Sequence, residues 1–155
     1  MATEQPRSAI ATTSGQMTRD EVTALFARRQ EAFEDLDAAA LATDYADDAT
    51  IESPISGVHG KKDVERNFRA VFDAFMDLKI TFEPPIIDGM HVAQLTVSEG
   101  TNIGGLMGLP PSGRPFKVTI MFLYELRDGK IIREQRIYDF TGLLVQVGIL
   151  KAKPA

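Results

Sequence analysis

The sequence contains no cysteine and only two histidines, His59 and His91, which stand far apart. Without cysteine, disulfide bonds, thiolate catalysis and cysteine-ligated metals are all excluded. The two histidines also lack the spacing of a metal site. We therefore expect no metal centre in this protein.

Basic clusters and long apolar runs are missing as well. The 155 residues include 17 Lys and Arg against 22 Asp and Glu, which gives a formal net charge of -5. This balance argues against nucleic acid or an anionic membrane as the main partner. No apolar run has the length of a membrane span, and residues 1–16 lack the apolar core of a secretory signal. We expect a cytoplasmic protein.

The length favours one domain with a sizeable core. Residues 1–16 are small and polar, and we interpret them as an N-terminal tail. The domain is expected over residues 17–150, and residues 151–155 form a short C-terminal tail.

Helical patterns dominate the first half. Thr18 and Glu21 form a capping-box pattern at the start of a helix that runs to about Leu36. A short helix is expected over 38–45, and apolar residues at helical spacing predict an amphipathic helix over 61–76. A last, apolar helix is expected over 140–147, where Gly148 suits its end.

Period-two patterns predict the strands. A short strand is expected over 50–53, ended by Pro54. Four longer strands are predicted over 78–87, 91–99, 116–126 and 130–139, and Asp128-Gly129 is typical of a hairpin turn between the last two. The order predicts an α+β fold: a strongly bent, mostly antiparallel sheet wrapped on the N-terminal helices as a cone-shaped barrel with an apolar internal pocket.

The predicted strand around Met121 is apolar on both faces. Val118 and Phe122 point one way, whereas Met121 and Leu123 point the other way. The helices can cover one face, so the other face needs a different cover. A second subunit is the simplest source, and we expect a homodimer that packs through the outer sheet face.

Asp139 is the first candidate for chemistry, because it ends a strand just before an apolar helix. Alternation along 131–139 places it on the same face as Gln135. A carboxylate among apolar side chains would be partly desolvated, which raises its pKa and makes it a better base. The alternative is that Asp139 simply caps the following helix.

Four stretches in register resemble the SnoaL-like polyketide (ester) cyclases, in the ketosteroid-isomerase-like and nuclear-transport-factor-like fold group. The resemblance covers about Thr18 to Leu150 and is strongest in the following segments: residues 136–148 (RIYDFTGLLVQVG), 45–49 with 53–54, 57–60 with 75–78, and 100–104 with 108–114.

The resemblance implies cyclisation by intramolecular aldol addition, without metal or organic cofactor. The acid/base aspartate of the family falls on Asp139, which would take a proton from a carbon flanked by two carbonyls and return it to the new alkoxide. The implied partner is a small apolar carbonyl-containing molecule. The sequence departs from the family at Asn102, where histidine is common, and at Gln135, where tryptophan is common; both can still donate to an enolate oxygen.

Other side chains are expected to contact this substrate. Arg29 lies in register with the apolar face of its helix, where it could enter the pocket or extend to water. Tyr45 could be a pocket hydroxyl or a core ring, and Glu99 a second pocket carboxylate or a solvated strand end. We also expect Phe72 and Met121 to contact the substrate.

Two further interpretations concern the segments around the pocket. His59 lies in a turn and is expected to be a rim or structural residue rather than a catalyst. The glycine-rich stretch 100–113 is apolar and lacks the signature of a phosphate loop, so it is interpreted as a flap over the pocket or as a plain surface loop.

Three other functions are considered. A ketosteroid isomerase is disfavoured, because Ser53 and Arg29 stand where those enzymes have their aspartate base and oxyanion tyrosine. An epoxide hydrolase of the same fold would need Arg29, Glu99 and Asp139 to converge on a water molecule. A non-catalytic ligand-binding or accessory dimer domain is the third possibility, because one fold hosts many functions.

Overall fold

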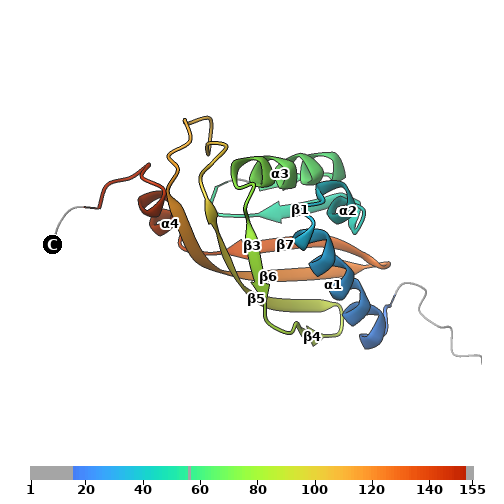
Figure 1. Cartoon of the computed structure of the whole chain (residues 1–155). Helices are drawn as coiled ribbons and strands as arrows, with labels where there is room; N and C mark the ends of the chain where they lie inside the picture. Colours follow the sequence, from blue (N-terminus) through green and yellow to red (C-terminus); the bar gives the residue numbers. More distant parts are fainter. Residues whose placement is uncertain (1–15, 56, 153–155) are drawn as a thin grey trace, which may run out of the picture.

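The computed structural model describes residues 16–55 and 57–152 (Figure 1). The expected N-terminal tail therefore lies almost wholly outside the described residues, and the expected C-terminal tail partly so. No described helix is long and apolar enough to cross a membrane. The elements in chain order are as follows: α1 (Arg19–Glu34), α2 (Ala38–Ala42), β1 (Tyr45–Glu52), β2 (Gly57–His59), α3 (Lys61–Ala74), β3 (Lys79–Phe82), β4 (Ile86–Asp88), β5 (His91–Thr101), β6 (Pro115–Arg127), β7 (Lys130–Ile137) and α4 (Phe140–Gln146).

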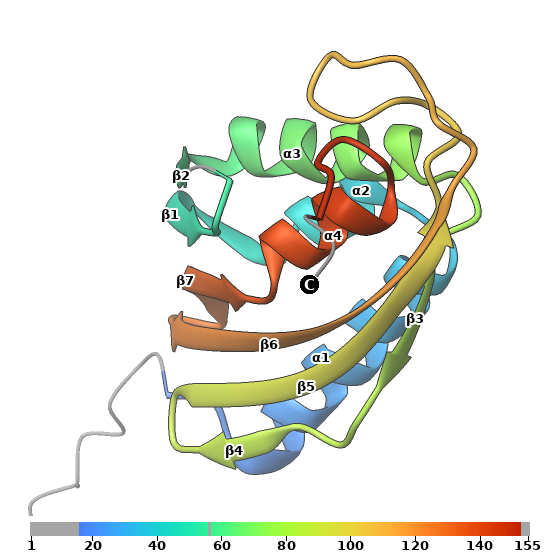
Figure 2. The same ribbon diagram turned by 90° about the vertical axis from the view of Figure 1, so that its left-hand side faces the viewer.

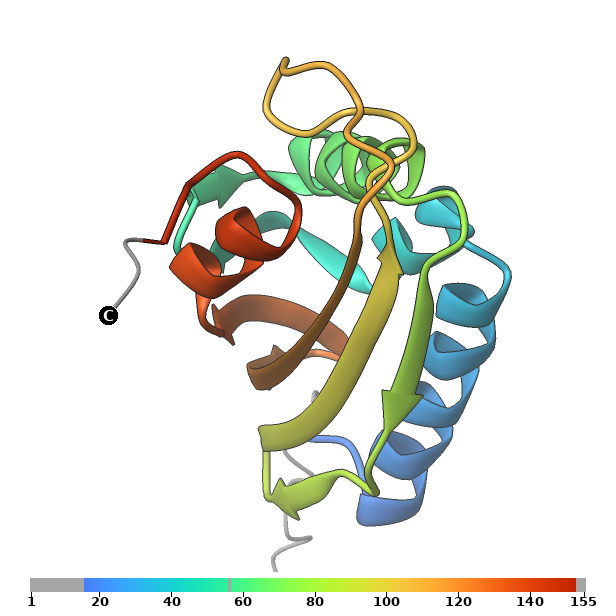
Figure 3. The same ribbon diagram turned by 60° about the vertical axis from the view of Figure 1, so that its left-hand side comes forward.

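The strands form one curved sheet in the order β2-β1-β7-β6-β5-β3, with β4 paired to β5. Among the described residues, the strand pairings are antiparallel except that of β1 with β7. Figures 2 and 3 show the sheet curving around α1 and α3, with α4 between α3 and β6. The sheet stays unclosed. The α+β class and the strongly bent, mostly antiparallel sheet are confirmed.

Local signals in the sequence fix several element ends. Thr18 and Glu21 form the expected capping box at the start of α1. Asp128 and Gly129 both have positive φ, of 51° and 76°, and make the expected tight turn between β6 and β7. Gly148, with φ of 81°, follows the end of α4 as predicted.

Two strand predictions need correction. The single strand expected over 78–87 is two short strands, β3 and β4, because Pro84 and Pro85 lie between them and proline cannot donate to a ladder. The strand expected over 50–53 begins earlier, at Tyr45, where β1 pairs in parallel with β7.

An extra residue in β7 decides which side chains face the interior. Leu126 pairs with Ile131, but Glu125 pairs with Arg133, so Ile132 has no partner of its own and forms a bulge. The bulge reverses the alternation beyond it. Ile131 and Glu134 are both buried, although three positions separate them. Strict alternation would have placed Arg133 inside instead.

The hydrophobic core lies between the concave face of the sheet and helices α1, α2 and α3. Phe33 on α1 makes ring contacts with Phe68 and Phe72 on α3, at centroid distances of 5.6 and 6.3 Å. A second cluster, around Phe75, Phe116 and Val147, packs α4 against the end of β6. The space between these two clusters contains the candidate site.

Candidate active site

An apolar cavity of about 100 Å³ lies inside the curve of the sheet. The walls come from α1, α3, β3, β5, β6, β7, α4 and the loop that follows β5. Six of the nine phenylalanines of the chain line it: Phe33, Phe68, Phe72, Phe75, Phe116 and Phe122. The expected internal pocket is therefore present in the fold, and its surface is aromatic and aliphatic.

Three polar side chains also line the cavity: Ser98, Arg136 and Tyr138. Ser98 is buried on β5, whereas Tyr138 is half-buried. Burial raises the pKa of Tyr138, so its phenol stays protonated at neutral pH and can donate a hydrogen bond. Among the described lining residues there is no carboxylate and no imidazole.

Arg136 is the charged group of the cavity, and its guanidinium is held on several sides. Nε donates to Glu134 Oε2 at 2.7 Å, and Nη1 donates to Asn67 Oδ1 at 2.9 Å. The guanidinium carbon lies 4.9 Å from the ring centroid of Phe68 and 5.9 Å from that of Phe122. Nη2 is buried and has no hydrogen-bond partner. An unpaired buried donor costs about 1–3 kcal/mol, and an acceptor supplied by a ligand would offset that cost.

Behind Arg136 lies a buried network of hydrogen bonds that runs from β7 to α1. Glu134 is fully buried, and its Oε1 accepts from Tyr45 Oη at 2.6 Å. Tyr45 Oη in turn accepts from Arg29 Nη2 at 3.0 Å. Arg29 Nη1 contacts Asp44 Oδ2 at 3.4 Å. The network fixes Glu134, and Glu134 fixes the orientation of Arg136.

The network also sets the ionisation of its members. Burial lowers the pKa of Arg136, but the charge and hydrogen bond of Glu134 together with Tyr45 and Tyr124 outweigh it, so the pKa of Arg136 is raised. Burial raises the pKa of Tyr45, against the influence of Arg29. Both arginines therefore stay cationic and Tyr45 stays neutral, so the cavity keeps a fixed positive charge at one wall.

The family model of the SnoaL-like polyketide cyclases matches residues 18–147. The chain belongs to the SnoaL-like polyketide cyclase family. Among curated proteins, none matches this chain.

Solved structures similar to this SnoaL-like protein have the same ketosteroid-isomerase-like fold. TsrD from Streptomyces laurentii has 22% identity and a TM-score of 0.76, over 86% of this chain and 99% of that one. IdmH from Streptomyces antibioticus, named as a candidate polyketide cyclase, has 28% identity and a TM-score of 0.67, over 84% and 99%. A protein from Catenulispora acidiphila, described as having that fold and bound to trimethylamine, has 22% identity and a TM-score of 0.67, over 89% and 100%.

The structure of this SnoaL-like protein corrects the expected position of Asp139. Its side chain is exposed and caps α4, where Oδ1 accepts from the backbone N–H of Gly142 at 2.8 Å. It is not part of the cavity wall. The physical reason is the bulge at Ile132, which turns Glu134, Arg136 and Tyr138 inward. The capping alternative describes what Asp139 does in the fold.

Gln135, Glu99 and Met121 were also expected in the pocket, and all three lie on the outer sheet face instead. The bulge at Ile132 turns Gln135 outward, as it does Asp139, and Gln135 Nε2 donates to Glu52 Oε2 at 2.9 Å. Glu99 alternates with the buried Ser98 and pairs across the sheet with Lys79 and Lys117. Met121 sits between two cavity-lining residues of β6, Ile120 and Phe122, and so faces the other way.

The remaining expected residues lie inside the protein. Phe72 lines the cavity. Arg29 and Tyr45 are buried in the network behind it, so Arg29 does not extend to water. Asn102 is fully buried, and its Nδ2 donates to Ser112 Oγ at 3.2 Å, so it holds the glycine-rich loop together rather than lining the cavity.

The glycine-rich loop covers part of the cavity, and His59 stands apart from it. Leu106 contributes to the wall, while Met107 and Leu109 on the same loop are 58% and 46% exposed. Figure 3 shows the loop projecting beyond the end of α3. His59 is an exposed residue of β2 and does not line the cavity.

Sequence reasoning missed the three residues that matter most here, Glu134, Arg136 and Tyr138. A signal was present, because the three alternate at positions 134, 136 and 138, and the last two lie within the family segment 136–148. Charged residues in a strand are usually exposed, and that rule hid Glu134 and Arg136.

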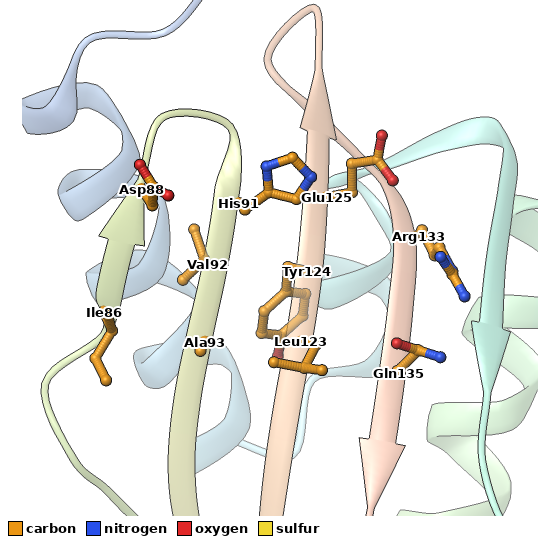
Figure 4. Close-up of a pocket in the computed structure, with 10 residues that line it drawn as sticks. All are labelled: Ile86, Asp88, His91, Val92, Ala93, Leu123, Tyr124, Glu125, Arg133 and Gln135. Atoms are coloured by element: carbon orange, nitrogen blue, oxygen red, sulfur yellow. The ribbon is translucent and has the colours of Figure 1, made fainter.

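The outer face of the sheet carries a second, larger hollow of about 290 Å³ (Figure 4). It is an open groove whose floor includes Ala93 and Leu123. A row of charged or titratable side chains crosses it, because Asp88 pairs with His91, His91 with Glu125, and Glu125 with Arg133. Its exposed, mixed surface differs from the enclosed aromatic cavity, and we place the candidate active site in the cavity.

Proposed function

We propose that this protein binds a small, largely apolar carbonyl compound in the cavity and promotes its intramolecular aldol-type cyclisation, without a metal or organic cofactor. The observation that carries the proposal is an aromatic cavity with one buried guanidinium whose Nη2 has no partner, in a chain of the SnoaL-like polyketide cyclase family. Apolar cavities with a few convergent polar groups are the usual form of small-molecule sites.

The walls can assist ring closure by holding one folded conformation of the substrate. Aromatic rings such as Phe68 and Phe72 enclose the carbon chain, and holding both reacting carbons close makes the bond-forming step effectively unimolecular. Arg136 Nη2 and the Tyr138 hydroxyl can donate hydrogen bonds to carbonyl oxygens. The phenol of Tyr138 can also protonate the alkoxide that forms when the ring closes.

The proton acceptor is assigned to water in this proposal. Asp139 would have to leave its cap on α4 to reach the substrate, and no described lining residue is a carboxylate or an imidazole. A carbon between two carbonyls is acidic enough for its proton to pass to water once the resulting enolate is stabilised. The new carbon–carbon bond then forms from that carbon to a second carbonyl of the same molecule.

The absence of a carboxylate or imidazole among the described lining residues also favours a second candidate, a non-catalytic ligand-binding domain. The epoxide-hydrolase arrangement receives no such support. Arg29 lies behind the cavity, Glu99 lies on the outer face and Asp139 caps α4, so these three side chains do not converge.

A tryptophan at Leu106 tests whether the cavity takes such a ligand. The chain has no tryptophan, so Leu106→Trp places the only indole at the cavity wall. We expect a blue-shifted emission, because Leu106 is 9% exposed, and saturable quenching by 1-phenyl-1,3-butanedione (benzoylacetone).

Leu109→Trp is the matched control, because Leu109 lies on the same loop but is 46% exposed. It is expected to emit at longer wavelength and to show no saturable quenching. Equal quenching of both variants, or none in the Leu106 variant, would contradict binding in the cavity.

To separate catalysis from binding, ring closure of nonane-2,4,8-trione is followed by NMR. Acceleration above buffer, retained in Asp139→Ser, supports the cyclase. Saturable binding without acceleration would establish the binding domain instead.

We also propose that the protein is a homodimer through the outer face of β5, β6 and β7. Leu95, Met121 and Ile137 are direct partners across these strands, and Leu95 and Ile137 are 39% and 57% exposed. Leu123, which is 36% exposed, lies on the same face. A contiguous apolar patch of this kind is typical of a surface that another protein covers.

Leu123→Glu is expected to shift the chain from dimer to monomer. A carboxylate buried without a partner is costly, and we expect dimerisation to weaken about a hundredfold or more. Size-exclusion chromatography with light scattering measures the mass in solution. Met76→Glu is the control, because Met76 is 58% exposed and follows α3, away from the sheet face. A wild-type chain that is monomeric across the micromolar range would rule the dimer out.

A further inference from the structure

We propose that Arg136 makes the cavity selective for a ligand that carries an anionic oxygen, a carboxylate or an enolate, on an apolar body. The inference rests on the proposed function, because it names the chemical class of the molecule in that same cavity. It adds a role for Arg136 that goes beyond a hydrogen bond to a neutral carbonyl. It also gives Glu134 the role of a positioning residue that acts through Arg136.

The first step is that the guanidinium is held in one orientation. Glu134 Oε2 accepts from Nε, Asn67 Oδ1 accepts from Nη1, and the ring of Phe68 lies against the guanidinium carbon. Glu134 cannot move away, because Tyr45 Oη donates to its other oxygen. A guanidinium held in this way loses little further freedom when a ligand binds, which favours a strong interaction.

The second step is that the guanidinium keeps one unused donor and that Arg136 lines the cavity. Nη2 is buried without a partner, and Arg136 is a lining residue. The surrounding walls are aromatic and aliphatic, so the surface around Nη2 offers few acceptors. Arg136 cannot lose the unpaired proton on Nη2, because guanidinium groups stay charged in proteins. An acceptor supplied by the ligand is the group that completes this site.

The third step concerns charge. The exposed Arg28 and the buried Arg29 both pair with Asp44, while Arg29 and Arg136 share the single carboxylate of Glu134. The buried charges balance, but Glu134 is divided between two arginines, so Arg136 keeps the capacity to bind a further acceptor. A charged acceptor on a buried guanidinium forms a shorter and stronger hydrogen bond than a neutral carbonyl does. The low dielectric of the aromatic cavity increases that difference.

The fourth step links charge selection to the proposed reaction. When a carbon between two carbonyls loses its proton to water, the bonding pair moves onto a carbonyl oxygen and gives an enolate. Arg136 Nη2 donates to that oxygen, so the enolate is stabilised relative to the neutral ketone. The guanidinium thereby lowers the pKa of the bound dicarbonyl and raises the fraction that is ready to attack the second carbonyl.

Two pairs of probes test the inference on the full chain. Calorimetry compares benzoate with its neutral analogue benzamide, and we expect benzoate to bind about tenfold tighter or more, since charge-assisted hydrogen bonds exceed neutral ones. The absorbance of benzoylacetone, titrated with pH in the bound state, is expected to show its enolate at least about one pH unit below free benzoylacetone. Neither measurement needs a variant.

Variants then assign both effects to Arg136. Glu134→Leu/Arg136→Met removes the charge pair together, so that neither partner is left buried alone. In this variant we expect benzoate and benzamide to bind equally, and bound benzoylacetone to form its enolate at the same pH as in water. Arg133→Met is the matched control, because Arg133 lies on the same strand but faces outward and pairs with Glu52. The tighter binding of benzoate and the lowered pKa of bound benzoylacetone are expected to remain in this variant. Circular dichroism checks that each variant is folded.

The outcomes separate the two proposals. If benzoate and benzamide bind with equal affinity, and the enolate titrates as in water, charge selection is overturned while binding in the cavity stands. If neither these compounds nor benzoylacetone binds or quenches the indole of the Leu106→Trp variant, the proposed function falls. If the preference for benzoate persists without Arg136, another group selects the anion and the assignment to Arg136 is overturned.

Discussion

Replacing Glu134 with leucine is expected to lower the free energy of unfolding by about 3–5 kcal/mol, a large part of the total stability of a domain of this size. Glu134 is fully buried and accepts hydrogen bonds from Tyr45 and Arg136, and its carboxylate also lies 3.9 Å from Arg29. Without it, Arg136 keeps its charge in an apolar enclosure with only Asn67 as an acceptor. An uncompensated buried charge is among the most costly defects in a protein.

Urea unfolding followed by far-ultraviolet circular dichroism measures this loss. Glu52→Leu is the matched control, because Glu52 also pairs with an arginine of β7, Arg133, but both partners are about half exposed. Exposed pairs contribute little, so a much smaller loss is expected there. The double variant Glu134→Leu/Arg136→Met is expected to recover part of the stability, because it removes the orphaned cation as well. Equal stability of Glu134→Leu and Glu52→Leu would contradict this account.

The parts of the fold that the sequence predicted are those set by local chemistry. The capping box at Thr18 depends on residues three positions apart, and the Asp128-Gly129 turn depends on two neighbours that accept positive φ. The amphipathic helix over 61–76, which is α3 in the structure, places Phe68 and Phe72 toward the core because helical spacing brings them to one face. Such features need no knowledge of the rest of the chain.

The residues of the site depend on a feature that local patterns do not reveal. Ile131 and Ile132 are alike in character, so nothing in the sequence marks Ile132 as the extra residue of a bulge. One extra residue exchanges the two faces of the strand beyond it. Asp139 and Gln135 thereby leave the cavity, and Arg136 and Tyr138 enter it. The pairing with β6 that creates the bulge is a long-range property.

The apolar outer face of the sheet explains why the sequence pattern wrongly predicted that Glu99 faces the pocket. On β5 the inward positions include the polar Gln94, Thr96 and Ser98, whereas Leu95 lies outside. Gln94 Nε2 donates to the backbone oxygen of Glu83 and Thr96 Oγ1 to that of Ile120, so both are satisfied in the interior. The rule that apolar side chains point inward fails here because the outside of the sheet is apolar as well. A covered outer face, as in the proposed dimer, resolves that contradiction.

The second large effect is expected from Phe68→Ala, with a loss of about 3–5 kcal/mol, as is usual when a buried ring is deleted. Phe68 is 2% exposed, and its ring lies 5.6 Å from that of Phe33 and 6.0 Å from those of Tyr45 and Phe72. It also lies against the guanidinium of Arg136, so its removal weakens the core and the support of the site together. Phe140→Ala is the control, because Phe140 is only half-buried and its ring contact is with Tyr138.

Benzene distinguishes an open cavity from a collapsed core in this variant. Removing the ring adds its volume to the existing cavity of about 100 Å³, and an apolar space of that kind binds small aromatic molecules. A ligand that binds only the folded state stabilises it in proportion to the logarithm of its concentration over its Kd. We therefore expect benzene to raise the midpoint of thermal unfolding more in Phe68→Ala than in the wild type or Phe140→Ala. A stability loss below about 1 kcal/mol in Phe68→Ala would show that Phe68 is not the link between the core and the cavity that its ring contacts indicate.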